Sequence, residues 1–270
     1  MALDWPAARE RMRSPLYAAL APALARMPSD RWPTRDDLNA AASGVSTSRG
    51  MALRFVNPRG HTDRERRHYE LRIAAAGEVE TRPESWHDLF NALAWITYPQ
   101  AKAKINAQHA AILEERGAEE AKRRSPARDA LTLFDEGGVI VASSEIGLLR
   151  LVKDFEWKEL FWHRRTELAA RVRFFAFGHG LFEQALAPHL GMVAKTVFIA
   201  ADEGFLALSP QAQVARADTF VAAHFSERAN FASPKGMAPM PVLGVPGWHP
   251  DTAGETYYDD AEHFRSKGVR

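Results

Sequence analysis

Apolar side chains recur every three to four residues along much of the chain, a spacing typical of helices that bury one face. Residues 14–27 carry such a stripe, which Pro22 breaks. A second short helix is predicted to start at Thr34, because Asp37 three residues later completes a capping box. The same spacing predicts further helices over residues 86–97, 100–120, 144–155, 156–172 and 209–226.

Alternating apolar and polar residues predict strands over residues 51–56, 69–73 and 195–201. The alanines at 74–76 would also suit the end of a helix. The segment DALTLFDEGGVIVAS (residues 129–143) holds two apolar runs joined by two acidic residues and two glycines. Because paired glycines permit the positive φ angles of tight turns, this segment is predicted to form a β-hairpin.

The order of these elements indicates an α+β fold that is mostly helical and contains β-hairpins, because strands and helices do not alternate regularly. After Asn230 prolines and glycines are frequent, which predicts an irregular C-terminal segment. A chain of 270 residues suits a single α+β domain over residues 51–270, with residues 1–50 as a helical extension packed on it.

The charge balance narrows the classes of partner. Lysine and arginine number 35 against 34 acidic residues, so no field of one sign draws the molecule to nucleic acid or to an anionic membrane. Nucleic-acid binding remains a minor hypothesis, through the basic residues in 122–128 and 164–173. Cysteine is absent, which excludes disulfides, thiolate nucleophiles and cysteine-bound metals. Neither a signal peptide nor a run of roughly 20 apolar residues is found, so a cytoplasmic location without membrane contact is expected.

The segment WHDLFNALAW (residues 86–95) places polar groups on a helix that is otherwise apolar nearly all round. Ser85 and Asp88 predict the helix start, with the Asp88 carboxylate accepting from the Ser85 backbone. His87 and Asn91, four residues apart, share one face. Since a buried polar group without a partner costs about 1 to 3 kcal/mol, a polar network is expected around them. His87 is then a core histidine, a metal ligand or a general base, and Asn91 a structural amide or one that orients a substrate.

On the next predicted helix Lys102, Asn106 and His109 follow each other at spacings of four and three, which makes one polar stripe. If this stripe faces His87 and Asn91, the two helices enclose a cleft that could bind a substrate. If it faces water, it is a solvated surface.

The segment FGHGLFE (residues 177–183) places His179 and Glu183 four residues apart at a helix start, a spacing that can direct an imidazole and a carboxylate to one metal. The flanking glycines could let backbone N–H groups approach an anion. Alternatively they mark close packing, and the second histidine of a zinc-protease helix is absent.

Two further segments offer candidate residues. Arg128 and Asp129, with Asp135 and Glu136 across the predicted hairpin, form an ion pair and turn formers, or alternatively supply carboxylate ligands of a metal. Trp248 and His249 lie in a proline-rich segment with several tyrosines and carboxylates. This segment could form the edge of a substrate site, or it could lie across the core.

Four segments in this order carry a resemblance to a known family: WHDLFNALAWITYPQAKAKIN, RDALTLFDEGGVIVA, FGHGLFEQAL, and PVLGVPGW followed by YYDDAEHFR. They resemble an uncharacterised bacterial family, domain of unknown function 3025, from about Tyr69 to Arg265. Residues 1–50 add nothing to the resemblance. The resemblance implies a bacterial, single-domain protein. It implies no activity and no catalytic residue.

Two hypotheses for function remain open. In the first, His87 and His179 converge in a cleft with one or more carboxylates and bind a divalent metal, which activates water on a phosphate or amide substrate. The candidate carboxylates are Asp88, Asp129, Asp135 and Glu183. In the second, the aromatic C-terminal segment of a non-enzymatic protein docks a small ligand or a protein. The chain has no G-x-S-x-G elbow, P-loop, dinucleotide-binding loop or H-E-x-x-H motif, which disfavours the enzyme classes that use them.

Overall fold

The computed structural model describes residues 3–58, 69–117, 119–120 and 123–267. Helices dominate and the strands form two small sheets, so the expected α+β class is confirmed. No helix in these described ranges is both long and apolar enough to span a membrane.

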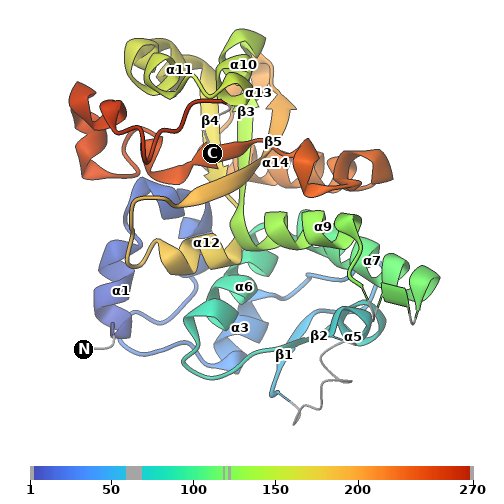
Figure 1. Cartoon of the computed structure of the whole chain (residues 1–270). Coiled ribbons are helices and arrows are strands. Elements are labelled where there is room, and N and C mark those ends of the chain that lie inside the picture. Colours follow the sequence, from blue (N-terminus) through green and yellow to red (C-terminus); the bar gives the residue numbers. More distant parts are fainter. Residues whose placement is uncertain (1–2, 59–68, 118, 121–122, 268–270) are drawn as a thin grey trace.

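The helices and strands follow one another as shown in Figure 1. Up to residue 116 they are α1 (Trp5–Arg11), η1 (Pro15–Leu20), α2 (Ala21–Leu24), α3 (Arg35–Ala41), β1 (Arg54–Val56), α5 (Tyr69–Ala76), β2 (Glu78–Glu80), α6 (Trp86–Thr97) and α7 (Pro99–Arg116). From residue 126 to residue 184 they are α9 (Pro126–Gly137), β3 (Gly138–Ser143), α10 (Ile146–Asp154), the π-helix η2 (Glu159–His163), α11 (Arg165–Arg171), β4 (Val172–Ala176) and α12 (His179–Gln184). The last part holds β5 (Val193–Ala200), α13 (Glu203–Leu206), α14 (Pro210–His224), β6 (Pro239–Pro241) and the short 3-10 helices η3 (Arg228–Phe231), η4 (Pro234–Gly236), η5 (Val242–Gly244), η6 (Pro250–Ala253) and η7 (Glu255–Asp259).

A four-stranded sheet with strand order β4-β3-β5-β6 forms the centre of the molecule. β3 runs parallel to β5 and antiparallel to β4, and it is buried at every position. Figure 1 shows α9 and α12 between this sheet and helix α6, with α5 and the parallel β1–β2 pair farther away. Helix α6 contacts α7 and α12, α9 contacts the same two helices, and α5 contacts α7.

The β-hairpin predicted over residues 129–143 is wrong. Its first half is the C-terminal part of α9, which starts at the cap residue Ser125 with Pro126 in the first turn. Its second half is β3, which pairs with β4 and β5 rather than with the preceding segment. A Cβ atom on Gly138 would lie 2.4 Å from the Phe134 carbonyl oxygen. The glycine therefore permits a direct passage from helix to strand instead of a two-strand turn.

Some of the other local predictions are confirmed and others are wrong. The strand predicted over residues 69–73 is wrong, because these residues begin helix α5. The capping box of Thr34 and Asp37 is confirmed, with hydrogen bonds in both directions. Residues 156–172, predicted as one helix, are divided into η2 and α11. The C-terminal segment is irregular as expected, with short 3-10 helices and the edge strand β6.

The N-terminal residues pack against the helices that carry the candidate site. The Tyr17 ring stacks on Phe90 of α6 and on Phe182 of α12, with centroid distances of 5.9 Å and 5.7 Å. Its hydroxyl donates to the Phe182 carbonyl oxygen at 2.9 Å. Trp5 stacks on Trp86 at the start of α6. These contacts hold α6 and α12 side by side, so that their first turns meet.

Candidate functional site

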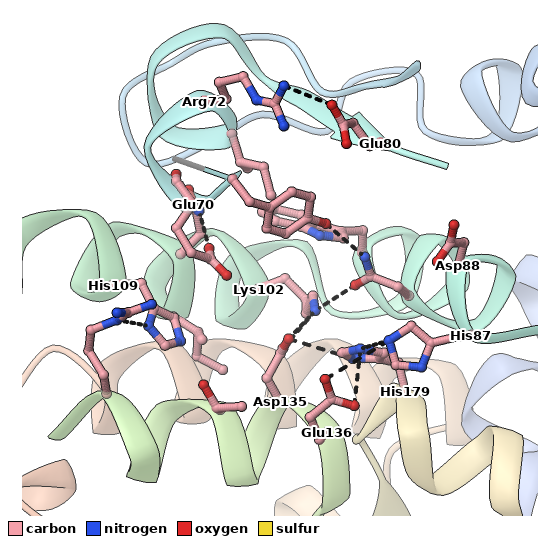
Figure 2. A pocket seen from close by; sticks show the side chains of 18 of the residues that line it. Glu70, Arg72, Glu80, His87, Asp88, Lys102, His109, Asp135, Glu136 and His179 are labelled. Atoms are coloured by element: carbon pink, nitrogen blue, oxygen red, sulfur yellow. Dashed lines mark hydrogen bonds and ion pairs between the residues drawn. The ribbon is translucent and has the colours of Figure 1, made fainter. Parts of the chain in front are cut away.

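A cavity of about 570 Å³ lies among helices α5, α6, α7, α9 and α12. Its polar and charged lining comes from segments that lie far apart in the sequence, and Figure 2 shows many of these side chains directed toward one another. They are Tyr69, Glu70 and Arg72 of α5, Glu80 and Arg82, His87, Asp88 and Asn91 of α6, Lys102, Asn106 and His109 of α7, Arg124, Arg128, Thr132, Asp135 and Glu136, and His179 of α12.

The first turn of α6 presents His87 to the cavity. Ser85 caps the helix, since its hydroxyl accepts from the Asp88 backbone N–H at 3.3 Å. The Asp88 carboxylate does not return to Ser85 as predicted, because it accepts from the backbone and guanidinium of Arg82 at 2.7 Å and 2.8 Å. Asp88 thus fixes the segment that precedes α6, and the neighbouring His87 imidazole points to α12.

Two imidazoles and a carboxylate converge at one end of the cavity (Figure 2). The Nε2 atoms of His87 and His179 lie 3.2 Å apart. Glu136 places Oε2 at 3.4 Å from His179 Nε2 and Oε1 at 4.0 Å from His87 Nε2. In the described part of the chain these three residues form a group whose ligand atoms all lie within 4.8 Å of one another.

The opposite nitrogen of each ring faces a second carboxylate. His87 Nδ1 lies 3.0 Å from Glu183 Oε2, and His179 Nδ1 lies 3.5 Å from Asp135 Oδ2. A carboxylate at Nδ1 favours the tautomer with hydrogen on Nδ1, which leaves the lone pair on Nε2. Two such lone pairs and the Glu136 oxygen would then face one another, and a cation between them satisfies all three.

The distances fit a first-row metal ion. Metal–nitrogen and metal–oxygen bonds of roughly 2.1 Å at tetrahedral angles separate two ligand atoms by about 3.4 Å. The observed separations on His179 Nε2 are 3.2 Å and 3.4 Å, and the third separation, between His87 Nε2 and Glu136 Oε1, is 4.0 Å. His179 is buried, whereas the side chains of His87 and Glu136 are 38% and 43% exposed. The group is therefore anchored on one side and accessible from the other.

Glycines at the start of α12 permit this convergence. A Cβ atom on Gly178 would lie 2.4 Å from the Glu136 carbonyl oxygen, and one on Gly180 would lie 2.7 Å from Glu136 Oε2. The backbones of α12 and α9 can approach this closely only because both positions lack a side chain. The segment Gly178-His179-Gly180 thus brings an imidazole to the last turn of α9, where Asp135 and Glu136 lie.

A buried ion pair forms the floor of the cavity beside the imidazoles. Lys102 Nζ donates to both carboxylate oxygens of Asp135, at 2.6 Å and 2.8 Å, and to Asn91 Oδ1 at 2.9 Å. Asn91 in turn donates to the Tyr69 hydroxyl at 3.3 Å. Burial, the largest single effect, acts to raise the pKa of Asp135, but the Lys102 ammonium together with the nearby imidazoles holds that pKa below its usual range. The stripe on α7 therefore faces His87 and Asn91 and not water, with Lys102 itself buried.

The sequence candidates separate into two sets. The structure brings His87, Asp135, His179 and Glu183 together, and it places Asp88, Asn91, Lys102, Asn106 and His109 on the cavity wall. Asp129 instead pairs with Arg124 at 3.1 Å and does not line the cavity. Trp248 is buried against Phe174, and the His249 ring stacks on Tyr257, both outside the cavity.

Glu136 is absent from the set of carboxylates that the sequence hypothesis expects to converge with the histidines. The sequence pattern places it with Asp135 in a hairpin turn and offers it as a metal ligand only as an alternative. The start signal of a helix at Ser125 and Pro126 could have indicated that both acidic residues lie on a last helical turn.

Comparison with known proteins gives one finding. The model of a family described as protein of unknown function (DUF3025) matches residues 53–268. Searches of curated proteins and of solved structures gave no match. The match covers all four sequence segments that suggested this family, together with every residue of the candidate metal group. The chain therefore belongs to the DUF3025 family.

Proposed function

We propose that the protein is a metal-dependent hydrolase that binds its metal ion through His87, Glu136 and His179. The observation that carries this proposal is the arrangement of the two imidazoles. Their Nε2 atoms lie 3.2 Å apart, while each Nδ1 atom faces a carboxylate of another residue. Metal-bound histidines commonly have their outer nitrogen held by a carboxylate; His87 shows this hydrogen bond with Glu183, whereas His179 Nδ1 lies near Asp135 without one.

The exposure of the group supports catalysis rather than a purely structural metal. Three protein ligands leave a coordination position open, and a divalent metal there lowers the pKa of a bound water to about 7. His87 and Glu136 border a cavity large enough for a small substrate. Glu183 and Asp135 orient the rings, and Lys102 balances the charge of Asp135.

The test begins with metal content. Protein purified without chelator is expected to contain close to one equivalent of metal, measured by inductively coupled plasma mass spectrometry. His87→Ala, His179→Ala and Glu136→Gln should each lose most of it. His189→Ala is the matched control, because His189 is an exposed histidine whose Nδ1 bonds to the neighbouring carbonyl of Leu190 and, among the described residues, not to a candidate ligand. Equal metal content in control and site variants, or no binding of added zinc or manganese by the wild type, contradicts the proposal.

Activity is tested on the metal-loaded protein with a panel of phosphate esters, amides and carboxylic esters. We expect hydrolysis of one class that is lost in His179→Ala and kept in His189→Ala. The same ligand set of two histidines and one carboxylate is also used by iron enzymes that consume dioxygen. A wild-type protein that binds iron and consumes dioxygen, with no hydrolysis, would leave the metal site in place and refute the hydrolase.

A further inference from the structure

The cavity continues away from the imidazoles to a second polar region. Figure 2 shows Glu70 and His109 on one side, His87 and His179 on the other, and Lys102 with Asp135 between them. We name the region of Glu70, Asn106, His109 and Arg128 the distal end of the cavity. All four residues line the cavity, and the proposed hydrolase chemistry uses none of them.

Arg128 lies on the wall of this end, and the contacts of its guanidinium group satisfy only part of its donors. Its Nε donates to His109 Nδ1 at 3.3 Å, and its Nη1 lies 3.5 Å from Glu120 Oε1. The Glu120 carboxylate is occupied elsewhere, since it accepts from the Ser125 backbone at 2.8 Å and from Arg116 Nε at 2.9 Å. Within the described residues Nη2 of Arg128 has no partner, and the side chain is only 16% exposed.

His109 lies beside two guanidinium groups at this end of the cavity. His109 is buried and accepts from Arg128, so its imidazole is neutral. Burial and then the positive charges of Arg128 and Arg124 lower the pKa of His109 to about 3. A cationic ligand would be repelled by these two guanidinium groups, whereas an anion could accept from the Nη2 of Arg128.

Glu70 is the carboxyl group at the distal end, and its burial favours the acid form although its hydrogen bond with Asn106 favours the carboxylate. Its Oε2 accepts from Asn106 Nδ2 at 2.6 Å, and burial raises the pKa of Glu70. In the acid form Glu70 offers an O–H donor beside Arg128 instead of a competing negative charge. Asn106 Oδ1 is buried without a hydrogen-bond partner, so this wall has one acceptor left as well.

We infer that the distal end is an anion subsite in which Arg128 binds a carboxylate or phosphoryl group of the ligand. A forked guanidinium with a free nitrogen, sheltered from water, is the usual protein group for such anions. The assignment of this anion to a substrate rests on the proposed function. The substrate would then be a small anionic compound held by Arg128 and cleaved beside His87 and His179.

Binding of simple anions tests the subsite without any reaction. Metal is removed with EDTA and dialysis, and inorganic phosphate and acetate are titrated separately into the folded protein by isothermal calorimetry. The wild type should bind one of them saturably. Arg128→Gln should weaken this binding at least tenfold, roughly the loss of one charged hydrogen-bonded contact. The preferred anion tells whether the ligand group is phosphoryl or carboxylate.

Arg116→Gln is the matched control, because Arg116 contacts the same Glu120 carboxylate but does not line the cavity. Its anion affinity should stay within about twofold of the wild type, since it removes no donor from the subsite. If Arg128→Gln does not fold, Arg128→Lys replaces it. This variant keeps the positive charge but loses the forked guanidinium, so it should bind the anion with reduced affinity. Equal weakening in the Arg116 and Arg128 variants, or no saturable binding by the wild type, overturns the inference.

The two proposals fail separately. Metal binding without anion binding removes the subsite and leaves the hydrolase standing. Anion binding by a protein that takes up no metal keeps the subsite and removes the hydrolase.

Discussion

Replacing Lys102 by methionine removes the positive charge beneath the proposed metal site while keeping most of the side-chain volume. Lys102 is 4% exposed in its side chain and Asp135 is 20% exposed. Loss of one partner leaves the other charge buried and unpaired, which destabilises a protein by about 3 to 5 kcal/mol when the pair is fully buried. Because Asp135 is partly open to the cavity, we expect Lys102→Met to lower the free energy of unfolding by about 3 kcal/mol. The free energy of unfolding is measured by urea titration in EDTA, so that metal does not contribute. The indole of Trp95, 5.6 Å from Lys102 Nζ, supplies a fluorescence signal.

A double-mutant cycle separates the pair from other effects. Combining Lys102→Met with Asp135→Leu removes both charges, so the double variant should be at least about 1 kcal/mol more stable than Lys102→Met alone. Lys267→Met is the exposed control, because the Lys267–Asp154 pair is more than half exposed on both sides, at 63% and 55%. It should cost less than about 1 kcal/mol. If Lys102→Met costs no more than Lys267→Met, or if the double variant is less stable than either single variant, the reasoning about the buried pair is refuted.

Three further predictions use the same unfolding assay. Gly178→Ala should cost about 1 to 3 kcal/mol and reduce metal content, because its Cβ would meet the Glu136 backbone. The control Gly137→Ala, whose Cβ would have no described atom within 4 Å, should change stability by less than about 1 kcal/mol. Equal effects of the two substitutions would contradict the close approach of α12 to α9. Because the pKa of His109 is lowered to about 3, its neutral form stabilises the protein above pH 6.5 and this contribution is lost as pH falls, by about 2 kcal/mol at pH 5. His109→Gln should lose correspondingly less between pH 7 and pH 5, and an identical loss in both proteins would disprove this. Burial raises the pKa of Asp218 to about 6, so its contribution has the opposite sign, present below about pH 4 and lost as pH rises through 6. The stability of wild type relative to Asp218→Asn should therefore fall between pH 4 and pH 6, and a rise would show that Asp218 is ionised throughout.

Local sequence signals predicted those parts of the molecule that depend on neighbours in the chain. The start of α6 at Ser85 and the capping box at Thr34 follow from contacts within four residues. The polar face of His87 and Asn91 follows from helical spacing, as does the stripe that begins at Lys102. These patterns indicated a polar network, and the structure contains one between α6 and α7.

The remaining features depend on contacts between distant segments. The acidic and glycine residues at 135–138 have the composition of a hairpin turn, but pairing of β3 with β4 and β5 determines their structure. The ligand role of Glu136 appears only when α12 approaches through Gly178. The sequence offers Arg128 as an ion-pair partner of Asp129 and as part of a basic run, but Asp129 pairs with Arg124, and the contacts of Arg128 with His109 and Glu120 join residues that no local pattern relates. No spacing rule within one segment reports such contacts.

The candidate metal ligands belong to segments that meet only when the chain folds. His87 and His179 are 92 positions apart, and Glu136 lies on a third helix between them. An unfolded or partly synthesised chain would have to close loops of this length before two nitrogens could share an ion. Metal should thus bind the folded state in preference to the unfolded state. It should stabilise the folded protein, so that the melting temperature rises with metal concentration. Uptake of metal can consequently serve as a readout of intact tertiary structure in any engineered or truncated form of this protein.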